Sequence, residues 1–340
     1  MSMTCTLVGA AIVVAVGIGS AQEMAKRFVF GSPGGVSTEA NQEIFWKPFT
    51  ARTGIEIIAE VPSSFGKLRA MVQSGKVTAS LWDLGTLQLE QAKALDLIEP
   101  IDWDQISPGP MFPEMRQQYG FGQTYFSTVM AWRADVKAPQ SWQDFWNVKD
   151  FPGKRSLSNF PAYTLPIAAL ADGVPPDKLY PLDLDRAFRS LDRIKPSVSV
   201  WWTTGAQPGQ LLVDNEVQYA NAWNGRVATL WEQGVRHNFN QGLLDIAWWV
   251  VPKGAPPAEK RAAMLFLHEW SDPAKQAEYA KRVYYTGSSP SLAALLPKDK
   301  LHMFPTTPEN KAKQILANGR WWFENADLVE KRWQAWKLGQ

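Results

Sequence analysis

The sequence predicts an α/β protein of two domains, with a parallel or mixed sheet that carries helices on both faces. Its 340 residues are more than a single hydrophobic core usually organises. With 45% hydrophobic and 20% charged residues, the composition is that of an ordinary folded chain. Short apolar runs alternate with amphipathic segments along the chain, which indicates strands that alternate with helices.

The N-terminal third shows this alternation first. A short apolar strand over 27–30 runs into a Gly-Ser-Pro-Gly-Gly loop, and Ser37 or Thr38 can cap the helix that follows. The same pattern predicts strands over 55–61 and 81–84, and helices that begin near 64 and at 90. In such sheets ligands bind beyond the carboxyl ends of strands, so the loops after Phe30 and Leu84 are candidate sites.

The remaining segments continue the pattern. A long β-rich segment with early glycines, 119–131, is expected to cross between the domains. Helices are predicted from 141 and over 163–171, 183–194, 207–213, 257–270, 272–283, 308–317 and 326–338. Strands are predicted over 155–158, 216–222 and 246–251.

The N-terminus predicts export. Residues 7–18 are apolar and are followed by Gly-Ser-Ala, a small-residue cleavage site before Gln22, so residues 1–21 are predicted to be a signal peptide. The stretch is short for a membrane span, and an uncleaved anchor is the alternative. The single cysteine, Cys5, precedes the apolar stretch, which excludes an intrachain disulfide and does not indicate lipid attachment. We expect a periplasmic protein.

The overall composition excludes several classes of function. The net charge is +2 and the Lys and Arg residues are dispersed, so neither nucleic acid nor an anionic membrane is an expected partner. The histidines, His237, His268 and His302, are isolated from one another, so we predict neither a metal site nor a cofactor. An exported hydrolase would need a nucleophile with a base, and no such constellation appears. No catalytic residue is therefore predicted.

Several segments, in their order along the chain, carry a specific resemblance. They are the strand over 28–30, Thr53-Gly54-Ile55, Trp82-Asp83-Leu84, Ser141-Trp-Gln-Asp-Phe-Trp146, Ala222-Trp-Asn-Gly-Arg226 and Val250-Val-Pro-Lys-Gly254. In this order they resemble the extracellular solute-binding proteins of ABC importers, specifically the spermidine/putrescine-binding branch.

The resemblance implies a type II periplasmic binding protein-like fold, in which two α/β lobes enclose a ligand cleft. Lobe 1 would comprise residues 27–126 and 247–290, and lobe 2 residues 127–246 and 291–340. A small-molecule ligand that touches both lobes would favour the closed state, which would dock as a monomer onto the permease subunits of the transporter.

Aromatic and acidic residues are the ligand-binding candidates that the resemblance implies. In the polyamine-binding branch, rings form a box around an alkyl chain and carboxylates meet the ammonium ends. Trp223 matches the tryptophan of that box. Asp245 lies near the position where the family has a carboxylate that binds the ligand. One of Trp201-Trp202 and one of Trp248-Trp249 are expected in the cleft, and we choose Trp202 and Trp248 because neighbouring strand residues face opposite sides. The third pair, Trp321-Trp322, is assigned to packing between lobe and tail.

One departure from the polyamine pattern changes the expected ligand. Where the branch has acidic residues, this chain reads Ser-Asn-Phe-Pro-Ala-Tyr-Thr-Leu over 158–165. Arg226 could instead bind a carboxylate, and Thr203, Thr204 and Ala206 precede a helix whose N-terminus favours an anion. These residues favour an ω-amino acid or an opine-like compound over spermidine, although a polyamine stays an alternative.

The other ligand-binding candidates come from the expected loops and crossings, and they are Ser32, Gly34, Gly35, Thr86, Tyr125, Ser127 and Tyr285. Tyr284 and Tyr285 also resemble the paired tyrosines of iron-binding relatives, so an iron-binding protein is a second alternative.

Overall fold

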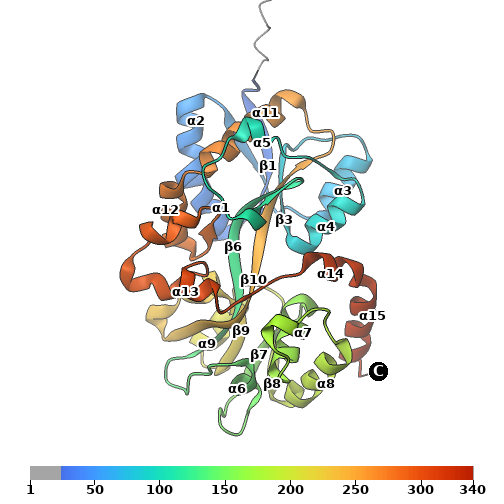
Figure 1. Cartoon of the computed structure of the whole chain (residues 1–340), viewed down its shortest axis with the longest axis vertical. Helices are drawn as coiled ribbons and strands as arrows, with labels where there is room; N and C mark the ends of the chain where they lie inside the picture. The colour runs from blue at the N-terminus through green and yellow to red at the C-terminus, as the bar shows by residue number, and fades with distance from the viewer. Residues whose placement is uncertain (1–23, 340) are drawn as a thin grey trace, which may run out of the picture.

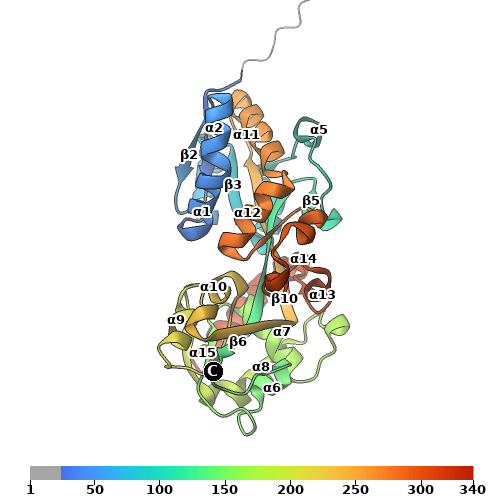
Figure 2. The same ribbon diagram turned by 90° about the vertical axis from the view of Figure 1, so that its left-hand side faces the viewer.

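Two long strands hold the molecule together. The structure, a computed structural model, describes residues 24–339. β6 (Gly120–Arg133) and β10 (Val235–Pro252) pair with each other in antiparallel fashion and run from the upper lobe into the lower one (Figure 1). The view turned by 90° shows the same two strands between the lobes (Figure 2). The predicted two-lobed α/β fold is confirmed.

All the main strands lie on one hydrogen-bonded path, in the order β2-β1-β3-β10-β6-β9-β7-β8. On the lobe 1 side the path contains β1 (Arg27–Gly31), β2 (Glu56–Glu60) and β3 (Leu81–Gly85), which pair in parallel. On the lobe 2 side it contains β7 (Arg155–Ser158), β8 (Val198–Trp202) and β9 (Tyr219–Trp223). The pairing of β6 with β9 and of β10 with β3 makes the sheet mixed.

Aromatic residues fill the core of lobe 1. The edges of Phe30 and Trp270 meet Trp249 at ring-centroid distances of 4.9 and 4.8 Å, and Phe266 lies against the same indole at 5.8 Å. The helices of this lobe are α1 (Gly35–Asn41), α2 (Lys47–Thr53), α3 (Phe65–Gln73), α4 (Thr86–Ala94), α5 (Trp103–Ile106), α11 (Pro257–Trp270) and α12 (Pro273–Val283). Most of the tryptophans here serve packing, as their size predicts.

The helices of lobe 2 follow the sequence patterns closely. Asp183 caps α8 (Leu184–Ile194) by accepting from the Arg186 backbone N–H, and Leu191 and Ile194 are buried on the same helix. The other helices of this lobe are α6 (Trp142–Trp146), α7 (Pro161–Ala171), α9 (Gln207–Val213), α10 (Asn224–Ala228) and α15 (Ala326–Lys337).

The C-terminal segment makes the third connection between the lobes. We expected a crossing near residue 290, but Leu292 and Phe304 first pack against α12. The predicted helix over 308–317 is wrong: α13 (Pro308–Lys311) is short, and β12 (Ile315–Leu316) pairs with β10. A helix that the sequence did not predict, α14 (Gly319–Glu324), then packs on α4.

Two boundaries near the cleft also differ from prediction. α1 begins at Gly35, so Ser37 and Thr38 lie inside the helix rather than capping it. Gly34, at φ 88°, makes the turn into that helix, in a backbone region that favours glycine. β10 begins at Val235, whereas the strand was predicted to begin only at residue 246.

The ladder between β6 and β10 is irregular near its middle. The register shifts between Asn238 and Leu243, and again between Ala247 and Trp248. Such irregularities bend and twist the strand that carries them. Asp245 lies between the two shifts, where both strands pass from one lobe to the other.

No helix within residues 24–339 is long and apolar enough to span a bilayer. The predicted signal peptide, residues 1–21, and Cys5 lie outside the described residues.

Candidate functional site

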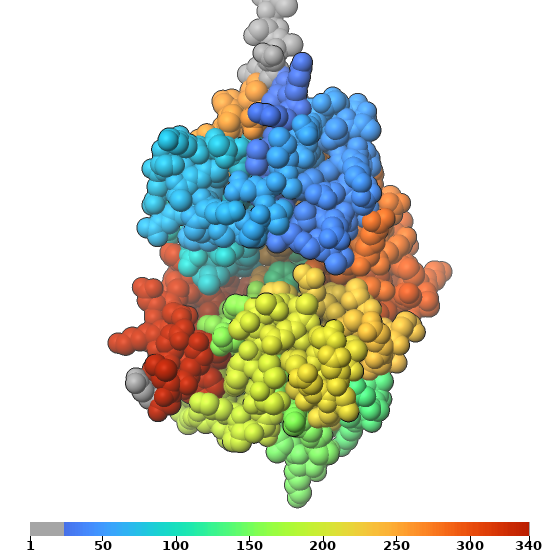
Figure 3. Space-filling view, turned by 180° about the vertical axis from the view of Figure 1, so that it is seen from behind, coloured from blue at the N-terminus to red at the C-terminus, as the bar shows by residue number. Residues whose placement is uncertain are grey.

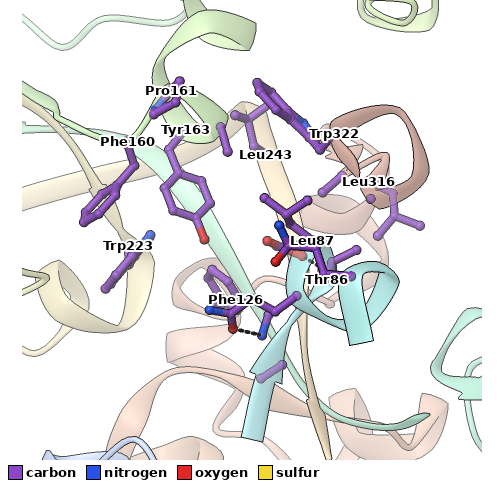
Figure 4. Close-up of a pocket in the computed structure, with 18 of the residues that line it drawn as sticks. Thr86, Leu87, Phe126, Phe160, Pro161, Tyr163, Trp223, Leu243, Leu316 and Trp322 are labelled. Carbon is purple, nitrogen blue, oxygen red and sulfur yellow. Dashed lines mark hydrogen bonds between the residues drawn. The ribbon is translucent and has the colours of Figure 1, made fainter. Parts of the chain in front are cut away.

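A cleft of about 870 Å³ lies between the two lobes. The surface is visibly hollowed there in the view from behind (Figure 3). Its walls come from the start of α1, the loop from β3 into α4, the middle of β6 and β10, the start of α7, the end of β9 and the segment around β12 and α14. The close-up shows side chains from both lobes around this space (Figure 4). Convergence of separate elements on one concave space is typical of small-molecule sites.

The structure brings a part of the predicted ligand-binding residues to this cleft. Those that line it are Gly34, Thr86, Trp223, Arg226, Asp245 and Tyr285. They come from elements that lie far apart in the sequence, so the fold alone gathers them.

Other predicted residues lie outside the lining of this cleft. Ser32 and Trp202 are buried, and the Ser32 hydroxyl is hydrogen-bonded to Thr38 at 2.6 Å. The indole N–H of Trp202 donates to Asn221. Gly35 begins α1 behind Gly34, which itself lines the cleft.

Tyr125 and Ser127 lie on β6 but face away from the cleft lining. Both are fully buried, and the Tyr125 hydroxyl donates to Glu114 at 2.6 Å. Phe126, between them, points to the opposite side of the strand and lines the cleft. The prediction chose the wrong face of this strand as the lining, because alternation fixes two faces without saying which one meets the ligand.

The segment before α9 is not part of the lining either. Thr203, Thr204 and Ala206 are exposed there. Gly205, among them, is close enough to the Trp223 ring that an added Cβ would lie 2.6 Å from it. This segment therefore borders the cleft from behind Trp223.

The tryptophan pair on β10 supports the cleft without lining it. Trp248 and Trp249 are both buried and belong to different packing clusters. The Trp248 indole N–H donates to the Thr86 hydroxyl at 3.0 Å, and that of Trp249 donates to Asp83 Oδ2 at 3.1 Å. Trp248 thus holds the Thr86 side chain in place by a hydrogen bond, and Trp249 does the same for Asp83.

Aromatic rings form one side of the cleft. Phe126, Tyr163 and Trp202 stand edge-on to the Trp223 ring, at centroid distances of 6.2, 5.8 and 5.5 Å. Phe126 also meets Tyr285 at 6.0 Å. Such edge-to-face contacts fix the rings and leave flat apolar surface for a ligand.

Arg226 brings a positive charge to this aromatic side. Its Nε is buried and has no hydrogen-bond partner among the described residues, and the same holds for the indole N–H of Trp223. Burial raises the pKa of Tyr285, while the neighbouring guanidinium of Arg226 opposes that rise through its charge and a hydrogen bond. A buried donor without a partner is costly, so these groups are suited to an anionic ligand group.

Asp245 brings a negative charge to the middle of the cleft. Its Oδ1 accepts from the Thr86 hydroxyl at 2.5 Å and from the Ile246 backbone N–H at 2.8 Å. Burial raises the pKa of Asp245, although both hydrogen bonds favour the ionised form. A ligand ammonium would replace the solvent that this carboxylate has lost.

Asp83 is a second carboxylate of the cleft, and the sequence analysis did not select it. It lies on β3, two residues before the end of a strand that leads to the sheet edge where ligands bind, and that position was the signal available. Burial raises its pKa to about 7, and the hydrogen bond from Trp249 only partly offsets this. The side chain is therefore near the midpoint of its titration at neutral pH.

This shift predicts how stability depends on pH. The unfolded aspartate titrates near pH 4, so between about pH 4 and about pH 7 the folded protein binds one more proton than the unfolded chain. Stability from this group is present at low pH and is lost as the pH rises through about 7. We expect Asp83→Asn, which carries no charge, to melt a few degrees above the wild type at about pH 8 and with little difference at about pH 5. Thermal unfolding of both proteins without ligand measures this, and a pH-independent difference would contradict it.

Other cleft residues were also missed by the sequence analysis. Phe160, Pro161 and Tyr163 belong to the segment that lacks carboxylates, and they line the cleft at the start of α7. Trp322 was assigned to packing in the tail, whereas it is both buried and part of the lining.

The described residues do not support a metal site. Residues 24–339 contain no group of three His, Cys, Asp or Glu side chains placed to hold a metal ion. The tyrosine pair is split, because Tyr284 stacks on Phe304 while Tyr285 lines the cleft. The iron-binding alternative therefore has no support.

Known proteins resemble this chain over nearly its whole length. Residues 45–327 match the family model described as bacterial extracellular solute-binding protein. A γ-aminobutyric acid-binding protein of Pseudomonas aeruginosa is 33% identical over 328 residues, which cover 93% of this chain and 92% of that protein.

Solved structures agree with the same assignment. An ABC transporter substrate-binding protein from Bradyrhizobium japonicum is 36% identical, with a TM-score of 0.85, over 91% of this chain and 99% of that one. A GABA receptor is 34% identical, with a TM-score of 0.84, over 91% of this chain and 97% of that one.

The expected spermidine/putrescine-binding branch is too narrow an assignment. The spermidine/putrescine-binding protein of Streptococcus pneumoniae is only 17% identical, and its TM-score of 0.75 shows a shared fold alone. The relatives at higher identity are solute-binding proteins rather than enzymes. The chain belongs to the bacterial extracellular solute-binding proteins, the substrate-binding components of ABC transporters.

Proposed function

We propose that this protein captures an ω-amino acid such as γ-aminobutyrate in the periplasm and delivers it to the permease of an ABC importer. The observation that carries the proposal is the placement of Arg226 and Asp245 in one aromatic cleft. A zwitterion with separated charges can satisfy both groups at once, since its carboxylate can meet Arg226 and its ammonium Asp245. Two relatives named for γ-aminobutyrate support the same ligand.

The aromatic side of the cleft suits the carbon chain between the two charges. The rings of Trp223, Phe126 and Tyr163 contact one another edge to face, and they line the same cleft as Arg226 and Asp245. Methylene groups gain about 0.8 kcal/mol each on leaving water for such an environment. The ligand would then contact residues of both lobes and stabilise the closed state.

A diamine is the competing ligand. Asp83 and Asp245 could each meet one ammonium group, which the sequence analysis did not foresee. A dication would, however, lie beside Arg226 without pairing it, and burying an unpaired cation is unfavourable. The geometry therefore favours the zwitterion.

Calorimetric titration of the purified protein with γ-aminobutyrate, putrescine and butyrate tests the proposal. We expect the zwitterion to bind at least about tenfold more tightly than either compound that carries charge of one sign only. A thermal-shift measurement should agree, because a ligand at about 100 times its Kd adds about 2.7 kcal/mol to the free energy of unfolding. Tight putrescine binding without γ-aminobutyrate binding would overturn the proposal.

Gly205 tests whether the Trp223 ring forms part of the site. An added Cβ would meet two ring carbons of Trp223 at 2.6 Å and the Arg226 Nε at 3.5 Å. We expect Gly205→Ala to displace the indole and to weaken γ-aminobutyrate binding by about tenfold, with little change in Tm because the loop is not in the core. Gly66→Ala, on α3 with no atom within 4 Å of the added Cβ, is the matched control. Equal affinity of both variants would contradict this role of the ring.

A further inference from the structure

The cleft continues on the other side of Asp245, away from Trp223. There the apolar side chains of Leu87 from α4, Leu243 from β10, Leu316 from β12, and Trp322 and Val329 from the C-terminal helices line it, while Asp327 and Glu330 of α15 line the same cavity from exposed positions. Figure 4 shows Leu243, Leu316 and Trp322 across the cavity from Trp223 and Phe160. We call the space bounded by these five side chains the apolar annex.

The single polar side-chain atom among these five residues is already paired. The indole N–H of Trp322 donates to the hydroxyl of Tyr180 at 2.9 Å, and Tyr180 lines the same cavity. Leucine and valine offer a ligand no hydrogen bond. These five side chains are therefore suited to an apolar group, and the carboxylates of Asp327 and Glu330 lie at exposed positions of the same cavity.

The volume of the cleft also indicates room for a further ligand group. Its volume is about 870 Å³, whereas γ-aminobutyrate has only seven non-hydrogen atoms. Sites of roughly 300–1,000 Å³ usually hold drug-sized ligands. An ω-amino acid held between Arg226 and Asp245 would leave the annex unfilled by ligand atoms.

Asp245 lies at the junction of the two parts. Burial raises the pKa of Tyr163 on the aromatic side, and the negative charge of Asp245 raises it further. The same two causes raise the pKa of Tyr180, on the annex side, to about 12, with the bond from Trp322 opposing. Asp245, Tyr163 and Tyr180 all line the same cavity, so a ligand nitrogen paired with the carboxylate can direct a substituent toward the annex.

We propose that the cleft accepts N-substituted ω-amino acids, in which a secondary ammonium pairs with Asp245 and its apolar substituent occupies the annex. This inference rests on the proposed function, since it requires the ligand carboxylate at Arg226. A protonated secondary amine keeps its positive charge and has two N–H groups, and one of them is enough to pair with the Asp245 carboxylate. The substituent therefore does not remove this ionic contact. An N-acyl group would remove the charge, and a polyol substituent would lose hydrogen bonds to water in the annex.

Four probes separate these cases by calorimetric titration: γ-aminobutyrate, N-benzyl-γ-aminobutyrate, N-acetyl-γ-aminobutyrate and N-glucityl-γ-aminobutyrate. We expect the benzyl compound to bind at least as tightly as γ-aminobutyrate itself, because the ring leaves water for an apolar space. The acetyl and glucityl compounds should each bind about tenfold or more weakly than the benzyl compound.

A variant that fills the annex adds a control within the protein. Ala326, the first residue of α15, lines the cavity and is half-buried, so Ala326→Trp should fill the annex. Leu328, on the same helix, is 51% exposed and does not line the cleft, so Leu328→Trp is the matched control. We expect Ala326→Trp to raise the Kd for N-benzyl-γ-aminobutyrate at least about tenfold and the Kd for γ-aminobutyrate less than about twofold. Leu328→Trp should change neither Kd.

The outcomes distinguish this inference from the proposed function. If γ-aminobutyrate binds and the benzyl compound does not, the annex inference is overturned and the proposed function stands. Tighter binding of the glucityl compound than of the benzyl compound would also overturn it, as would equal losses for both ligands in Ala326→Trp. If no compound of the series binds, the proposed function itself fails.

Discussion

Arg226→Ala should raise the Kd for γ-aminobutyrate about 100-fold, a loss of about 3 kcal/mol in binding free energy. The buried Nε of Arg226 has no partner among the described residues, so the ligand carboxylate is the group expected to pair with it. Removing the guanidinium leaves that carboxylate desolvated without a counter-charge, which accounts for the size of the loss. Arg226→Lys should recover only part of the affinity, because an ammonium cannot bind a carboxylate through two parallel N–H groups.

Calorimetric titration measures this effect, and Arg189→Ala is its control. Arg189 is exposed on α8 and does not line the cleft, and its removal changes the net charge by the same amount. We expect the control to bind γ-aminobutyrate like the wild type. An unchanged Kd in Arg226→Ala would place the ligand carboxylate elsewhere.

Asp245→Asn is the second substitution with a large expected effect. The amide keeps the shape of the carboxylate and can still accept from the Thr86 hydroxyl, but it has no charge for the ligand ammonium. We expect the Kd for γ-aminobutyrate to rise about 30-fold or more. Binding of butyrate, which has no ammonium group, should not weaken.

Stability should respond in the opposite direction. Burial raises the pKa of Asp245, so its ionised form is unfavourable in the folded protein without ligand. The Tm of Asp245→Asn without ligand should therefore equal or exceed that of the wild type at neutral pH. Asp177→Asn, at an exposed position, is the control. A variant that lost affinity and Tm together would show that the carboxylate is needed for the fold rather than for the ligand.

The sequence was most informative where local chemistry decides the structure. The helices capped by Ser64, Ser141 and Asp183 begin close to the predicted positions, because each hydroxyl or carboxylate accepts from a backbone N–H three residues further along the chain. The alternation of strands and helices also gave the fold class correctly. These features depend on residues close together in the chain.

The first half of β10 shows a signal that was present but not used. Val235, His237 and Phe239 are buried in alternation with more exposed residues, which is the period of a strand. The polar residues among them resemble a loop by composition. Period rather than composition would have extended the strand to its true beginning.

Where the predicted residues differ from the observed cleft lining, the reason is different. Alternation along β6 separates Tyr125 and Ser127 from Phe126, but only the packing of both lobes decides which set meets the ligand. Likewise, no local pattern brings Trp322, near the C-terminus, to the same cavity as Thr86. These placements depend on contacts between segments that are distant in sequence.

The irregular ladder around Asp245 has a consequence for engineering. The residue that we assign to the ligand ammonium stands between two register shifts, at the place where the connecting strands bend. A substitution at this position that accepts a new compound would also change the equilibrium between the open and closed forms. In a biosensor built on this scaffold, the selectivity and the size of the signal could therefore not be adjusted separately at this position. Trp223, on a strand end outside that bend, offers a position where recognition can be changed alone.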